Sequence, residues 1–195
     1  MFGQLTDLLR ITRAHLILRR YFVVNGFDGA LTMLGLLVGF YVGDEASTRV
    51  IVGACLAVAV ALGASGITSA YFSEAAEKQA ELRELEGAML TNLHNSAYGR
   101  AARILPVVTA LVNGLAPALF SLIIMTPLLA ASWWAGVSPL SPIETSIAVA
   151  MLVIFMLGVF LGRVSGVFWL WSGLRMSLVA VITTAIIFIV SPTVS

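Results

Sequence analysis

The sequence predicts an all-α membrane protein with five transmembrane helices, and three observations lead to this fold class. Of the 195 residues, 59% are hydrophobic and 11% are charged, whereas a water-soluble domain carries about 25% charged residues. The mean hydropathy of the chain is +1.00. Five separate stretches are apolar over the ~20 residues that a helix needs to cross a bilayer. The net charge of +1 gives no attraction to nucleic acid, which we do not expect as a partner.

The five predicted spans form one transmembrane domain over 21–195. Pro106, Pro117 and Pro127 lie within the third span, where a membrane helix tolerates prolines as kinks. The spans cover about 22–43, 50–72, 104–133, 143–162 and 172–190.

Two further helical segments are expected outside the bilayer. Apolar residues near helical spacing, with arginines between them, predict an amphipathic helix over 1–20 on the cytoplasmic surface. The alternative for 1–20 is a solvated tail. Arginines follow the first apolar residues and no small-residue cleavage site is present, so this segment is not a signal peptide. The second helix is expected to extend into the cytoplasm, where it forms the first part of a helical segment over about 74–103.

Basic residues predict the orientation, because cytoplasmic loops collect lysine and arginine. One side of the predicted membrane holds ten basic residues, and the other side holds Arg49 alone. The N-terminus is therefore expected in the cytoplasm and, with five spans, the C-terminus outside. The ten basic residues are Arg10, Arg13, Arg19, Arg20, Lys78, Arg83, Arg100, Arg103, Arg163 and Arg175.

Asp28 lies inside the first predicted span, six residues after Phe22 and so about 9 Å along the helix. A carboxylate near the centre of a spanning helix costs about 2.5–3.5 kcal/mol, and such residues normally face a pathway or a partner. Asn25 and Thr32 share the face of Asp28. Asp28 is therefore a candidate site for a proton or a metal cation. The alternative is an acid that only fixes helix packing.

A row of carboxylates beyond the second span is a second candidate metal site. Its members are spaced 3, 4 and 3 residues apart, which places them within an arc of about 80° on one helix face. Like charges at this spacing repel, and hard divalent ions take oxygen ligands. The alternative is a solvated helix face that Lys78 partly neutralises. The row consists of Glu74, Glu77, Glu81 and Glu84.

Glycines at four-residue spacing indicate close helix packing, because small residues let helices approach each other. The spacing does not choose between packing within the chain and a homodimer. The two groups are Gly35, Gly39 and Gly43 on the first span, and Gly158, Gly162 and Gly166 at the end of the fourth.

Other chemistry has little support in the sequence. Cys55 is the chain's one cysteine, so one copy cannot form a disulfide or a cysteine cluster. Ser165 has no evident histidine and aspartate companions for a hydrolase. No phosphate-binding loop or dinucleotide fingerprint is present. We therefore predict that the protein is not an enzyme and holds no permanently bound cofactor.

Several stretches, in order along the chain, resemble the vacuolar iron transporter family. Residues 19–43, with the Asp28 and Gly29 pair, are similar to the family's first helix, RRYFVVNGFDGALTMLGLLVGFYVG in this chain. Residues 63–86 are similar to its second helix running into the cytoplasm, GASGITSAYFSEAAEKQAELRELE in this chain. Residues 114–117 resemble part of its third helix, and 162–176 resemble the end of its fourth and the start of its fifth.

The resemblance implies a homodimer that exports Fe²⁺, with Mn²⁺ as a common companion, from the cytoplasm in exchange for protons. It implies a pore at the dimer interface that is lined by the first two helices, with Asp28 as the pore aspartate. It also implies that the region 74–84 is the family's acidic cytoplasmic extension. The polar residues expected to line this pore are Asn25, Thr32, Ser65, Thr68 and Ser69.

The chain departs from the family pattern at three places. Gly66 stands where well-known members carry a pore methionine, and Val58 stands where some carry a second pore carboxylate. The large metal-binding domain between the second and third helices is reduced to about 74–103. The chain therefore resembles a short, prokaryote-type member of the plasma membrane. Its remaining ligands are all oxygen, which suits Mn²⁺ at least as well as Fe²⁺.

These observations predict a secondary transporter that exports divalent metal, with Fe²⁺ or Mn²⁺ as the transported ion. The alternative is a non-transporting membrane scaffold in which Asp28 only fixes helix packing.

Overall fold

The computed structural model describes residues 14–43, 46–130 and 140–190. These residues form five α-helices and no strand. All five helices are long and apolar enough to cross a membrane, which confirms the predicted all-α fold class with five spans. The helices are α2 (Ala14–Gly43), α3 (Thr48–Met89), α4 (Ala97–Leu129), α6 (Pro142–Ser165) and α7 (Trp169–Val190).

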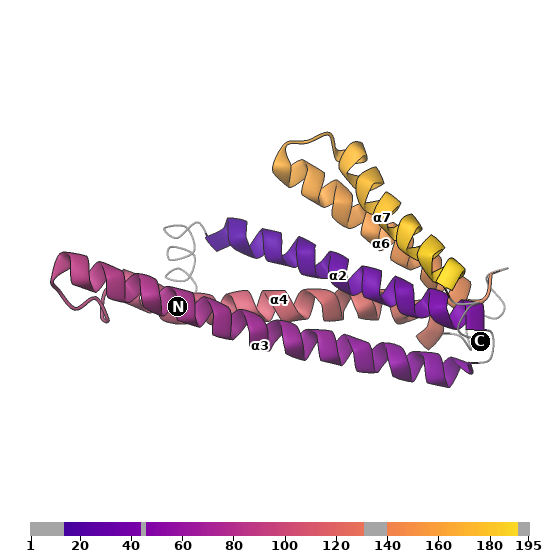
Figure 1. The fold of residues 1–195 in the computed structure, drawn as a ribbon, viewed down its shortest axis with the longest axis horizontal. Helices are drawn as coiled ribbons and strands as arrows, with labels where there is room; N and C mark the ends of the chain where they lie inside the picture. Colours follow the sequence, from indigo (N-terminus) through magenta and orange to yellow (C-terminus); the bar gives the residue numbers. More distant parts are fainter. Residues whose placement is uncertain (1–13, 44–45, 131–139, 191–195) are drawn as a thin grey trace.

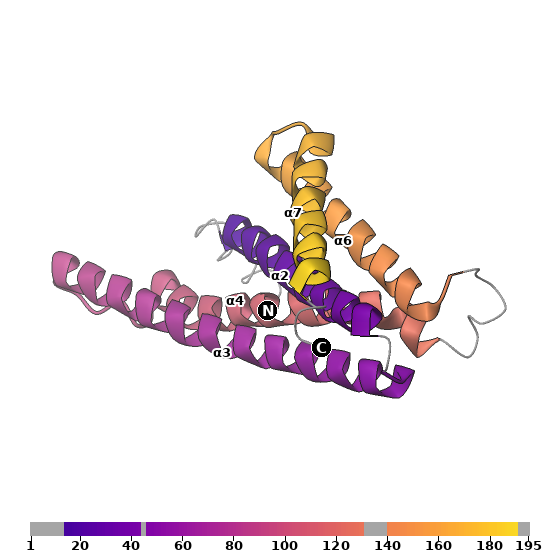
Figure 2. The same cartoon turned by 45° about the vertical axis from the view of Figure 1, so that its right-hand side comes forward.

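Helix α2 is central in the arrangement. It packs against α4 and α6 and also contacts α7 and α3. Helices α3 and α4 lie side by side as a long hairpin on one side of α2, and α6 and α7 form a second pair on the other side (Figure 1 and Figure 2). The far end of the α3–α4 hairpin projects beyond the other helices in both views.

The core lies where α2 meets α4 and α6. Met33 and Leu37 of α2 are fully buried against Ile124 and Met125 of α4 and Ile154 of α6. Since lipid is as apolar as these side chains, their contribution inside a membrane comes from close packing rather than from exclusion of water. This core fixes α2 against α4 and leaves the outer face of α3 largely exposed.

Two predicted boundaries differ from the structure. Residues 14–20, expected within a separate surface helix over 1–20, are the first turns of α2. No glycine or proline interrupts the chain between Ala14 and Phe22, so the helix continues unbroken into the span. The remaining part of that predicted helix, residues 1–13, lies outside the described residues. The third span was expected to reach residue 133, but α4 ends at Leu129, and 131–139 also lie outside the described residues.

The second helix extends well beyond its apolar part, as predicted. Helix α3 has 42 residues, which corresponds to about 63 Å at 1.5 Å per residue, whereas the hydrocarbon core is only about 30 Å thick. A left-handed residue, Leu90 with φ of 49°, ends α3. The Ser96 hydroxyl accepts a hydrogen bond from Gly99 N at the start of α4. The predicted segment over 74–103 is therefore the end of α3, a turn and the first two turns of α4.

Candidate functional site

Helices α2 and α4 are in backbone contact where two glycines of α2 face α4. A Cβ on Gly29 would lie 2.6 Å from Pro117 Cα, and a Cβ on Gly26 would lie 2.6 Å from the Phe120 ring. Both distances are far below van der Waals contact. At Gly29 the obstacle is the α4 main chain, so no larger residue fits there, whereas at Gly26 the Phe120 ring would have to move. This crossing holds the face of α2 that carries Gly26 and Gly29 against α4.

Helices α3 and α4 also approach each other closely, at Asn113 and Gly114, about one turn before Pro117 on α4. A Cβ on Gly66 would lie 3.0 Å from the main-chain oxygen of Asn113, and a Cβ on Gly114 would overlap the Gly63 carbonyl. Small residues thus bring three helices together around Asn113. The methionine that the resemblance leads one to expect at position 66 would meet the α4 backbone there.

Asn113 joins the three helices by hydrogen bonds. Its Nδ2 donates to the Gly66 carbonyl of α3 at 2.8 Å, and its Oδ1 accepts from Asn25 Nδ2 of α2. Asn25 Nδ2 also donates to the Tyr21 carbonyl at 2.9 Å. Asn113 is only 7% exposed, and a buried amide of this kind requires such partners. Asn25, predicted to line a pore, therefore points inward to α4.

A second polar contact joins α2 to α3. The Tyr21 hydroxyl donates to Glu74 Oε1 at 3.0 Å, and Glu74 is only 7% exposed. Glu74 was predicted as the first member of a surface row of carboxylates. In the structure it is buried and bound to the neighbouring helix instead.

Asp28 lies on the outer face of α2 and is exposed, as is Thr32 one turn later. The Thr32 hydroxyl donates to the Asp28 main-chain oxygen at 2.7 Å, so it binds its own helix. Within the described residues, the Asp28 carboxylate has no hydrogen-bond or ion-pair partner. The polar face predicted from the sequence is therefore divided, with Asn25 turned inward and Asp28 and Thr32 turned outward.

The hydroxyl residues of α3 also lie on an outer face. Ser65, Thr68 and Ser69 are all exposed. The Thr68 hydroxyl donates to the Ala64 carbonyl at 2.8 Å, and the Ser69 hydroxyl donates to the Gly66 carbonyl at 3.5 Å. These side chains cover α3 with small polar groups, and the hydroxyls of Thr68 and Ser69 bond their own helix.

The remaining members of the carboxylate row have different surroundings. Glu81 forms an ion pair with Lys78 at 2.8 Å and accepts a hydrogen bond from the Tyr98 hydroxyl at 2.9 Å. Glu77 and Glu84 are exposed. Across the described ranges, no group of three or more histidine, cysteine or acidic side chains is placed to hold a metal ion. One chain therefore does not gather the row into a single centre.

The predicted glycine groups differ in their packing. A Cβ on Gly158 would lie 2.7 Å from Gly173 Cα, and one on Gly162 would lie 2.8 Å from Ser172 Cβ, so this group allows α6 and α7 to meet. Gly166 is the left-handed C-cap of α6, with φ of 69°. On α2, a Cβ on Gly35 would make only an ordinary 3.6 Å contact, and the two following glycines of that group, Gly39 and Gly43, have nothing within 4 Å. Within one chain, the glycines that pack α2 are Gly26 and Gly29.

Sequence reasoning missed Tyr21 and Asn113 as site residues. Asn113 carried a usable signal, because an amide inside an apolar span needs a partner in the protein. Tyr21 gave no such signal, because tyrosine is common at the ends of spans, where they meet the membrane surface.

The five long apolar helices indicate a multi-pass membrane protein, and its first candidate span carries an acid, Asp28, on an exposed helix face. Comparison with curated proteins finds an uncharacterized protein, MJ0645, of Methanocaldococcus jannaschii. The two are 28% identical over 164 residues, which are 80% of each chain. No protein-family model and no solved structure matches the chain.

Proposed function

We propose that the protein is a secondary transporter that exports a divalent metal ion, Fe²⁺ or Mn²⁺, in exchange for protons. Asp28 is the metal and proton site in this proposal, and two copies enclose the pathway. The observation that carries the proposal is the exposed Asp28 carboxylate, which has no partner among the described residues.

An exposed carboxylate inside a bilayer requires a partner. Leaving it against lipid costs about 2.5–3.5 kcal/mol on the insertion scale, and binding of a proton or a cation removes that cost. Asp28 shares its outer face with Thr32, and α3 adds the exposed hydroxyls of Ser65 and Thr68. Carboxylate and hydroxyl oxygens suit Mn²⁺ at least as well as Fe²⁺.

A homodimer supplies what one chain lacks. One copy offers a single unpartnered carboxylate, and a divalent ion is better balanced by two. A two-fold axis along the exposed faces of α2 and α3 brings the two Asp28 side chains to one cavity, because such an interface uses the same patch on both copies. Gly39, where an added Cβ would meet no atom of the described residues within 4 Å, lies on α2 beyond Asp28 and is available to this interface.

The proposed orientation follows from the basic residues. The projecting α3–α4 hairpin carries Lys78, Arg83, Arg100 and Arg103, which favours a cytoplasmic position by the positive-inside rule. The N-terminus is then cytoplasmic too. The exposed carboxylates Glu77 and Glu84 stand at the proposed cytoplasmic mouth, where they raise the local concentration of cations. The resemblance to short family members favours a prokaryotic plasma membrane.

The alternative, a membrane scaffold in which Asp28 only fixes helix packing, has less support. An acid that fixes helices within one chain would bond a neighbouring helix, as Asn25 and Tyr21 do. The Asp28 carboxylate has no such bond in the part of the chain that the structure describes.

Metal flux in proteoliposomes tests the proposal. Wild-type protein should move Mn²⁺ or Fe²⁺ in response to a pH gradient, and Asp28→Asn should reduce this flux to that of empty liposomes. The matched control is Glu144→Gln, because Glu144 is an acid that caps α6 at Ser141 and lies outside the proposed pathway. Unchanged flux in the Asp28→Asn protein would show that the assigned role is wrong.

A further inference from the structure

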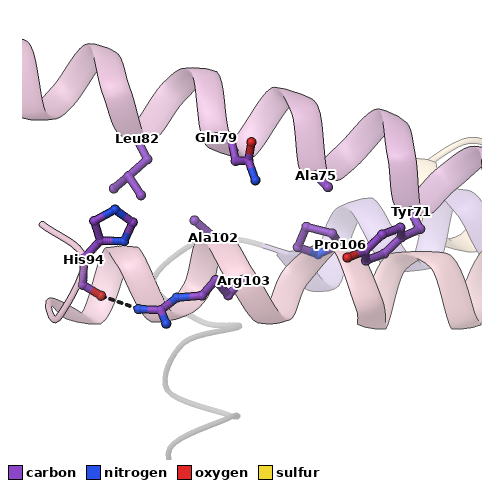
Figure 3. Close-up of a pocket in the computed structure, with 8 residues that line it drawn as sticks. All are labelled: Tyr71, Ala75, Gln79, Leu82, His94, Ala102, Arg103 and Pro106. Atoms are coloured by element: carbon purple, nitrogen blue, oxygen red, sulfur yellow. Dashed lines mark hydrogen bonds between the residues drawn. The ribbon is translucent and has the colours of Figure 1, made fainter.

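A cavity of about 200 Å³ lies between α3 and α4 along the projecting hairpin, from Tyr71 and Pro106 to His94 in the turn (Figure 3). Since a water molecule takes up about 30 Å³ in the liquid, the cavity has room for a group of several heavy atoms. The acidic row of α3 lies on a different face of the helix, where Glu74 and Glu81 turn to Tyr21 and Tyr98.

The polar side chains around this cavity are hydrogen-bond donors or cations. Gln79 and His94 point into the space between the helices, with the Tyr71 hydroxyl and the Arg103 guanidinium at its edges (Figure 3). No acidic side chain is among the described residues that line it. This composition fits an anionic ligand better than a metal cation, because it offers a guanidinium and no carboxylate.

The Arg103 charge is not neutralised by a carboxylate in the described chain. Arg103 Nε donates to the Gly99 carbonyl at 3.3 Å, and Nη2 donates to the His94 carbonyl. The one ion pair found in the described ranges joins Lys78 and Glu81. The guanidinium is therefore held in place by main-chain oxygens while its positive charge stays available.

The cavity begins, at Tyr71 and Pro106, where the apolar part of the hairpin ends. Beyond Tyr71 the α3 sequence becomes charged, and beyond Arg103 the α4 sequence becomes apolar. Basic pockets between membrane helices at this level bind lipid head groups, and tyrosine and arginine are typical of it.

An exposed apolar track leads away from Arg103 along α4. Val107, Leu111 and Leu115 follow it at four-residue spacing and are between 45% and 57% exposed. Leu111 and Leu115 also line an apolar groove of about 440 Å³ next to Phe22 of α2. The cavity and the apolar track thus follow each other along α4.

We propose that this cavity binds the phosphate of an anionic phospholipid. Arg103, His94 and Gln79 contact the phosphate oxygens, and one acyl chain follows Val107, Leu111 and Leu115 along α4. Free inorganic phosphate has the same head chemistry, but it would leave the apolar track uncovered. The proposal does not depend on metal transport.

Lipid retention measured by native mass spectrometry tests this site. Wild-type protein released from mixed phosphatidylglycerol and phosphatidylcholine nanodiscs should retain phosphatidylglycerol selectively. Gln79→Glu places a carboxylate in the cavity at nearly constant volume and should abolish that selectivity, as should Arg103→Gln. Arg100→Gln is the matched control, because Arg100 lies one turn earlier on α4, also donates to a turn carbonyl, that of Asn95, and does not line the cavity.

Two outcomes would overturn the proposal. The first is equal retention of phosphatidylglycerol by wild type, Gln79→Glu and Arg103→Gln. The second is thermal stabilisation of the detergent-purified protein by inorganic phosphate that depends on Arg103, without selective lipid retention, which would assign the cavity to a soluble anion. Gln79→Glu keeps the test valid if Arg103→Gln weakens the turn, since Gln79 has no hydrogen bond to that turn in the described residues.

Discussion

Gly29 shows how one residue determines the position of a helix. Its missing Cβ lets Pro117 of α4 lie directly on the α2 backbone. Any side chain there would push against a proline whose ring is held inside a helix and cannot rotate away. The neighbouring Asp28 therefore owes its outward position to the glycine beside it.

We predict that Gly29→Ala destabilises the protein by about 1–3 kcal/mol, the usual range for overpacking. The reason is the 2.6 Å approach to Pro117 Cα, which is main chain and cannot give way. Gly87→Ala is the control, because Gly87 lies near the end of α3 with nothing within 4 Å. It should leave stability unchanged or raise it by up to about 1 kcal/mol through helix propensity. Denaturant unfolding in detergent compares the two, and equal stabilities would contradict this packing.

The division between Asn25 and Asp28 illustrates what residue spacing can predict. Residues three apart on a helix differ by about 60° in direction, so their spacing predicted one shared face. The edge of the α2–α4 contact falls between them, and Asn25 turns to Asn113 while Asp28 turns away. Spacing within one helix carries no information about where its contact with a neighbouring helix stops. That is why the two could not be separated beforehand.

At the scale of elements, the contact between Tyr21 and Glu74 holds α2 to α3, which otherwise touch little. The two helices meet mainly through α4, so this hydrogen bond is a direct link. Its acceptor is a buried carboxylate, and a buried charged group without a donor is costly.

We predict that Tyr21→Phe lowers the free energy of unfolding by about 1–3 kcal/mol, the cost of leaving a buried acceptor unsatisfied. Tyr98→Phe is the matched control, because its hydroxyl also donates to a glutamate. Glu81 keeps its ion pair with Lys78 and has a side chain that is 37% exposed, so this loss should stay near 0–1 kcal/mol, about the worth of a surface ion pair. Unfolding curves of both variants measure the two losses in free energy of unfolding. A loss for Tyr98→Phe as large as that for Tyr21→Phe would contradict the special role of the buried Glu74 acceptor.

The helix packing of α2 was harder to predict than its existence. The regular spacing of Gly35, Gly39 and Gly43 indicated the packing face, yet Gly26 and Gly29, only three residues apart, make the close crossing. Regular spacing identifies where two helices can approach over several turns. A single crossing at a proline of α4 needs only one turn, which leaves no repeat in the sequence.

At the scale of the whole molecule, composition and length were sufficient for the fold class. Five apolar runs produced five helices in the expected order. The order in space was not predictable, because α2 rather than α3 or α4 became the central helix. All five sequences are apolar over most of their surface, so hydropathy does not distinguish a lipid-facing helix from a central one.

We predict that two copies meet along the outer faces of α2 and α3. Single cysteines at Thr32, Ser65 and Thr68, in a Cys55→Ala background, should include at least one that forms a disulfide-linked dimer in membranes. A disulfide needs Cα atoms about 4.4–6.8 Å apart, so only positions near the two-fold axis can react. Leu178→Cys on α7 is the control, since Leu178 is also exposed but lies on another helix. Gel electrophoresis without reductant reads out the result, and linkage at Leu178 alone would place the interface elsewhere.

Helix α3 runs without a break from Thr48 to Met89, near the tip of the projecting hairpin (Figure 1). An unbroken helix acts as a rigid lever, because a tilt at one end displaces the other. Glu77 and Glu84 stand on its outer arm, and Ser65 and Thr68 stand on its inner arm. A tilt of the outer arm would therefore also displace Ser65 and Thr68, and the close contact of Gly63 and Gly66 with Asn113 and Gly114 is the point about which α3 would turn.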